Sequence, residues 1–144
     1  MGREIRTINI EKPEPVLGGL SIEYTDVSLI EEETLKVLSD IDKIQWSRMS
    51  THEISTEFSN FMSNLWKIHP FREGNTRTII TFCCKFAEDN GFPLDTNFLT
   101  DNADYLRTAL VAASATFSDI GDFSKKEYLL EIIFDAIQRG KSPL

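Results

Sequence analysis

Residues 69–78 read His69-Pro70-Phe71-Arg72-Glu73-Gly74-Asn75-Thr76-Arg77-Thr78, which places an imidazole, a carboxylate and a guanidinium in one short stretch. Apolar residues precede this stretch at spacings of three and four, which predicts a helix with one buried face: Ile54, Phe58, Phe61, Met62, Leu65 and Ile68. A mostly apolar segment follows and runs to Asn90-Gly91, as in a buried helix. Because Pro70 disfavours helical backbone at His69 and Gly74 permits a sharp turn, we expect a helix-loop-helix corner.

The start of the second helix predicts a binding site for phosphate. The first amides of a helix have no partner within the helix, and together with the helix dipole they attract anions. In this chain those amides belong to Gly74, Asn75, Thr76 and Arg77. The guanidinium of Arg77 adds a fork of donors for phosphate oxygens.

Two further side chains suit a nucleotide-dependent transfer reaction. His69 can exchange a proton near neutral pH and is our candidate general base. Glu73 offers the oxygen ligand that Mg²⁺ takes beside substrate phosphates. Each of these residues by itself is compatible with an ordinary helix connection, and it is their combination that favours a catalytic site.

The stretch resembles the signature of the Fic family, His-x-Phe-x-(Asp/Glu)-Gly-Asn-Gly-Arg-x-x-Arg, and it matches at His69, Phe71, Glu73, Gly74, Asn75 and Arg77. Residues 3–10 also resemble the lead-in of Fic domains, and residues 16–28 stand where the family carries a flap hairpin. The resemblance implies a mainly α, Fic-like helical bundle with one short β-hairpin near the N-terminus. It implies a single domain over residues 1–144 with the active-site motif at 69–80.

Members of this family most often transfer AMP from ATP to a Ser, Thr or Tyr hydroxyl of a target protein. The resemblance therefore implies that His69 is the general base and that Glu73 holds Mg²⁺ bound with ATP. It also implies nucleotide contacts at four positions: Gly74, Asn75, Thr76 and Arg77. The resemblance also implies two partners, ATP and a hydroxyl-bearing target protein.

The sequence departs from the family pattern at two positions. Thr76 replaces a Gly, which requires that this position avoid backbone conformations reserved for Gly. Ile80 replaces the final Arg, which in the family orients the terminal phosphates. Three alternatives to the transferase therefore stay open, namely a Doc-like protein kinase, a nucleotide-binding or interaction module without catalysis, and a plain helical scaffold.

Residues 16–28 carry the pattern of a hairpin. Gly18-Gly19 is a turn signal, and apolar residues alternate with polar ones in the segment that follows. The exposed edge of such a strand can add main-chain hydrogen bonds from a target segment. We therefore expect the target to dock on the flap, at Ser21, Ile22, Glu23 and Tyr24.

The remaining helices are predicted from caps and apolar spacing. Ser28 with Glu31 forms a capping-box pattern before a helix that extends to Ile41. Residues 102–113 and a segment after Ser124 predict two more helices, and we expect the last one to end at Gly140.

Composition limits the classes of function. The 144 residues carry a net charge of −8, which argues against nucleic-acid binding because that needs a basic surface. No apolar run is long enough for a membrane span, and the first residues lack the apolar core of a secretory signal. We expect a cytoplasmic protein, or one delivered into a host cell as part of a longer effector.

An inhibitory antitoxin-type protein and a second copy of the chain stay open as partners.

Overall fold

The computed structural model describes residues 4–141, and most of them are helical. The helices are α1 (Ile30–Asp42), α2 (Thr51–Ile68), α3 (Asn75–Asp89), α4 (Thr96–Asp101), α5 (Ala103–Ala113) and α6 (Glu127–Lys141). Three short 3-10 turns cover Pro15–Leu17, Val27–Leu29 and Trp46–Arg48. The predicted mainly α fold is confirmed. Arg3 of the expected lead-in, and both ends of the range 1–144, lie outside the described residues.

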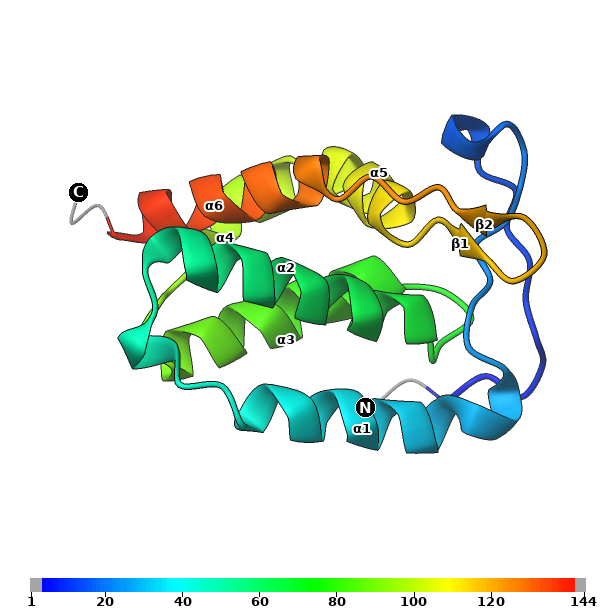
Figure 1. Ribbon diagram of the computed structural model, residues 1–144, viewed down its shortest axis with the longest axis horizontal. Helices are drawn as coiled ribbons and strands as arrows, with labels where there is room; N and C mark the ends of the chain where they lie inside the picture. Colours follow the sequence, from blue (N-terminus) through cyan, green and yellow to red (C-terminus); the bar gives the residue numbers. More distant parts are fainter. Residues whose placement is uncertain (1–3, 142–144) are drawn as a thin grey trace.

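Helix α2 occupies the middle of the bundle. It packs against α1, α3, α5 and α6, and in Figure 1 it runs between α1 and α6. Its inward face carries Phe58, Met62 and Trp66, which are fully buried. Ser50 and Glu53 form the capping box that starts the helix. Across residues 4–141, none of the helices is sufficiently long and apolar to traverse a bilayer.

The prediction of a β-hairpin in residues 16–28 is wrong, because this segment contains no strand. The described strands are β1 (Thr116–Phe117) and β2 (Gly121–Asp122), which pair antiparallel between α5 and α6. In the expected flap, the chain does reverse, since Glu14 N–H donates to the carbonyl of Leu20 at 3.0 Å. Pro13 and Pro15 on either side have no N–H to donate, so the pairing cannot extend into a ladder.

Two predicted helix ends also differ from the structure. The predicted cap before α1 is the hydroxyl of Ser28. In the structure the capping acceptor there is the carboxylate of Asp26, which accepts from the backbone N–H of Ser28. Gly140 lies inside α6 and does not end it. A Cβ at position 140 would lie 2.0 Å from the carbonyl oxygen of Pro93, so the glycine is required by close packing between two segments.

Candidate active site

The predicted helix-loop-helix corner is present. Helix α2 ends at Ile68, and the residue after it, His69, has left-handed backbone with φ 51° and ψ 59°. Helix α3 starts after Gly74, which has φ 77°. The first helical bond of α3 runs from Thr78 N–H to the carbonyl of Gly74 at 3.0 Å. Thr76 lies in regular α-helix, which explains why a threonine is accepted where the family pattern has glycine.

A cavity of about 570 Å³ opens at the N-terminus of α3. It brings together the six motif residues that the sequence predicted: His69, Glu73, Gly74, Asn75, Thr76 and Arg77. Lys12 from the N-terminal segment and Arg107 from α5 also line the cavity, and sequence reasoning did not select either of them. The cavity therefore has the first residues of α3 on one wall and cationic side chains from distant parts of the chain, Lys12 and Arg107, on the others.

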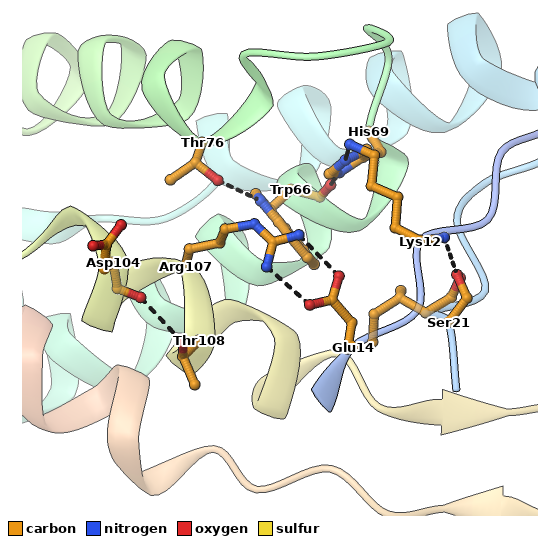
Figure 2. Close-up of polar contacts among 10 residues, drawn as sticks. Lys12, Glu14, Ser21, Trp66, His69, Thr76, Asp104, Arg107 and Thr108 are labelled. Carbon is orange, nitrogen blue, oxygen red and sulfur yellow. Dashed lines mark hydrogen bonds and ion pairs between the residues drawn. The ribbon is translucent and has the colours of Figure 1, made fainter. Parts of the chain in front are cut away.

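His69 is held in one tautomer by its surroundings. Its Nδ1 lies 3.1 Å from the carbonyl oxygen of Trp66, and because a carbonyl can only accept, Nδ1 carries the proton. Nε2 therefore has a lone pair, which accepts a hydrogen bond from Lys12 Nζ at 3.0 Å, as Figure 2 shows. The ring of Tyr24 stacks on the imidazole with centroids 4.0 Å apart. Although His69 is only 2% exposed, its basic nitrogen points to the cavity side occupied by Lys12.

Burial, and then the positive charge of Lys12, lower the pKa of His69 from 6.5 to about 3. Below pH 6.5 the unfolded chain binds a proton on this residue and the folded chain does not, so acid favours unfolding. We expect the free energy of unfolding to fall by about 1.4 kcal/mol per pH unit below 6.5, about 2 kcal/mol between pH 7 and 5. Urea unfolding at several pH values measures this slope. The variant His69→Asn, which has no imidazole, should show a flatter dependence, and an equal slope would contradict the assignment.

The side chain of Asn75 shapes the loop. Its amide oxygen accepts from the backbone N–H of Phe71 at 3.0 Å, and its amide nitrogen donates to the Phe71 carbonyl at 2.8 Å. The neighbouring Thr76 hydroxyl accepts from the indole N–H of Trp66 at 3.1 Å. These bonds fix the loop on α2, so that the backbone amides at the start of α3 face the cavity in a set position.

Arg6 is a structural residue of the site that sequence reasoning missed. The residue is 3% exposed, and the hydrogen bonds of its guanidinium go to backbone carbonyls. Nε donates to His69 O at 2.6 Å, and one terminal nitrogen donates to Ile68 O at 3.1 Å and also to Thr25 O. These bonds satisfy the carbonyls at the C-terminus of α2, where a cation is also favoured by the helix dipole. No sequence pattern marks this role, because an isolated Arg in an extended segment is usually exposed.

Glu73 is the residue that could hold a metal ion at this site. It is exposed and lies on the cavity wall. Within residues 4–141 no three His, Cys, Asp or Glu side chains come together as a metal site. A single carboxylate fits Mg²⁺, which usually takes one or two protein carboxylates and fills its remaining positions with water and substrate phosphates.

The four predicted flap residues are held by internal contacts. Ile22 is 2% exposed and belongs to the hydrophobic core, and Tyr24 stacks on the catalytic candidate His69. Ser21 donates to the carbonyl of Ile22, and the carboxylate of Glu23 accepts from the backbone N–H and hydroxyl of Ser118. The segment is thus fixed between the core and the β1–β2 turn, and docking of a target on it stays a prediction.

Comparison with protein-family models matches residues 2–87 to the Fic/DOC family. The match covers more than half of the chain and contains the whole motif stretch 69–80, whereas α4, α5 and α6 lie beyond it. A comparison with curated proteins gives no match.

Proposed function

The chain belongs to the Fic/DOC family, and on this premise we propose that it is a protein adenylyltransferase that transfers AMP from ATP to a Ser, Thr or Tyr hydroxyl of a target protein. The observation that carries the proposal is the fixed tautomer of His69. Its unprotonated Nε2 lies on the wall of a cavity that also contains the first amides of α3. A base and an anion site in one cavity are what transfer of a phosphate group to a hydroxyl needs.

In the proposed reaction, the target hydroxyl oxygen attacks the α-phosphorus of ATP. A new oxygen–phosphorus bond forms while the bond from the α-phosphorus to the oxygen bridging to the β-phosphate breaks, and pyrophosphate leaves. The hydroxyl proton passes to Nε2 of His69. The bond from Nδ1–H to the Trp66 carbonyl holds the imidazole in place and stabilises the cation that forms.

The cavity wall stabilises charge on the phosphates. The first amides of α3 and the guanidinium of Arg77 donate to phosphate oxygens. Glu73 would hold Mg²⁺, which neutralises negative charge on the polyphosphate. Positioning and electrostatics of this kind account for most catalysis of phosphoryl and nucleotidyl transfer.

Lys12 occupies the position that a substrate hydroxyl needs. Its ammonium donates to Nε2 of His69 at 3.0 Å, which is the distance expected between the base and the hydroxyl. Burial lowers the pKa of Lys12, with a further contribution from Arg107. When the target binds, Lys12 has to turn away from His69, and the polyphosphate proposed for the same cavity offers it negative charge.

The docking of the target is proposed for the segment Ser21–Tyr24, which lies beside Lys12 and His69. Inhibition by an antitoxin-type protein, and a second copy of the chain as a partner, belong to the same proposal.

Incubation with a cell lysate and ATP labelled at either the α- or the γ-phosphate tests the function. We expect protein-bound label from α-labelled ATP, and none when EDTA removes Mg²⁺. Label from γ-labelled ATP alone would show a kinase of the Doc type. Binding of Mg-ATP without transfer of either label would show a nucleotide-binding module.

A further inference from the structure

Helix α5 brings a second guanidinium to the cavity. Arg107 donates from its two terminal nitrogens to the two carboxylate oxygens of Glu14, at 2.9 and 2.8 Å, across 93 positions of sequence. Figure 2 shows the two side chains facing each other below Lys12. The Glu14 side chain is 5% exposed, whereas that of Arg107 is 39% exposed and lines the cavity.

Glu14 is itself held firmly. Its N–H donates to Leu20 O, and its carbonyl accepts from the N–H groups of Leu17 and Gly19 at 3.0 and 2.9 Å. A two-point contact with a fixed carboxylate restricts the long Arg107 side chain to one orientation. The position of this guanidinium is therefore set before any ligand enters.

The Arg107 side chain keeps donors for a ligand. A guanidinium has five N–H donors, and Glu14 receives two of them. The other three make no hydrogen bond to a protein group within residues 4–141. A charged group that is positioned by one partner and still has donors next to a cavity is arranged to bind an anion.

We infer that Arg107 binds the phosphates of the nucleotide beyond the one that is attacked, and that Glu14 is its positioning residue. The inference rests on the proposed nucleotide site. The wall of the cavity formed by α3 has Ile80 where the family pattern has a second Arg, so this wall offers no charge at that position. Arg107 supplies a guanidinium from the opposite wall, where α4 and α5 enclose the cavity.

Charges on the wall agree with this role. Lys12, Arg77 and Arg107 are the cationic lining residues, and Glu73 and Asp104 are the acidic ones. Because Glu73 is the proposed ligand of Mg²⁺, a bound Mg-triphosphate meets three cations around its oxygens. The positive charge of Arg107 also reaches Lys12 and contributes to the lowering of its pKa, which places the two cations close together.

Calorimetric titration of the purified chain with Mg-ATP, AMP and inorganic tripolyphosphate tests the inference. For Arg107→Ala we expect about 10- to 100-fold weaker binding of Mg-ATP and tripolyphosphate, the usual effect of losing charged hydrogen bonds. Binding of AMP should change less than about threefold, because AMP lacks the outer phosphates. Arg48→Ala removes an exposed arginine outside the cavity and is the matched control for net charge.

Arg107→Gln separates a binding role from a structural one. Glutamine can still donate one hydrogen bond to Glu14 but has no charge for a phosphate. We expect it to unfold at a higher temperature than Arg107→Ala, because one hydrogen bond to the buried Glu14 carboxylate is kept, and its affinity for tripolyphosphate to fall as in Arg107→Ala. If Arg107→Ala does not fold, Arg107→Gln decides the question.

The outcomes for the two proposals differ. Unchanged Mg-ATP affinity in the Arg107 variants, or equal losses for AMP and Mg-ATP, would overturn the role of Arg107 and leave the proposed function standing. Binding of tripolyphosphate that depends on Arg107, in a protein that transfers no AMP, would overturn the proposed function and support the role of Arg107. No binding of any of the three ligands by the unchanged chain would overturn both.

Discussion

The variant His69→Ala is expected to transfer AMP at least about 100-fold more slowly than the unchanged protein, the lower end of what a general base contributes. The proton of the target hydroxyl then has no acceptor, because among the described residues it is His69 that presents a lone pair fixed by the Trp66 carbonyl. Affinity for Mg-ATP should change less than about threefold, since the amides of α3 and Arg77 remain. Single-turnover transfer from α-labelled ATP, with calorimetric titration of Mg-ATP, measures both quantities.

The second histidine gives a matched control. His52 is exposed in the first turn of α2, outside the cavity, and His52→Ala should transfer AMP at the normal rate. His69→Asn tests whether the left-handed backbone at this position affects the result, because Asn tolerates that conformation better than Ala. Normal turnover in either His69 variant would refute the assignment of the base.

The largest effect on stability is expected for Arg6→Met, which should lower the free energy of unfolding by about 3–5 kcal/mol. Methionine fills a similar volume but donates no hydrogen bond. The carbonyls of Ile68, His69 and Thr25 would then lose a charged donor in a buried place. Urea unfolding followed by circular dichroism measures the change.

Two further variants serve as controls for the stability of Arg6→Met. Arg48→Met makes the same replacement at an exposed position and should stay within about 0.5 kcal/mol of the unchanged chain. Arg6→Lys keeps the charge but cannot reach several carbonyls with a rigid fork, so an intermediate loss is expected. A loss below about 1 kcal/mol for Arg6→Met would show that water satisfies the carbonyls of α2 and that Arg6 does not hold the corner.

The motif corner was predictable because its determinants are local. Pro70 ends α2 at Ile68, and Gly74 takes the left-handed backbone that begins α3. Helix α2 likewise begins with the capping box of Ser50 and Glu53, which contact each other within one turn. Where the cap had a competitor, local reasoning was less accurate, since Asp26 and not Ser28 accepts the hydrogen bond before α1.

Residues 16–28, the expected flap, could not be predicted correctly from local sequence. Alternation of apolar and polar residues predicted a strand that offers Ile22 to a target, but no strand forms and Ile22 is buried in the core. A strand needs a partner with free N–H groups, and Pro13 and Pro15 remove them from the neighbouring arm. Whether an alternating segment pairs as a strand depends on the second segment, which local alternation does not describe.

Local sequence accounts for the mainly helical fold, for the corner at residues 69–78 and for the residues that form one wall of the cavity. These features depend on backbone preferences and on apolar spacing, which act within a few residues of one another. It takes the folded chain to bring Lys12 into contact with His69, Arg6 to the end of α2, and Glu14 to Arg107. The two residues of each contact are separated by 57, 63 and 93 positions in the sequence, respectively. Each contact forms because folding buries polar groups, which then need a hydrogen-bond partner. No local sequence pattern indicates which distant residue that partner is.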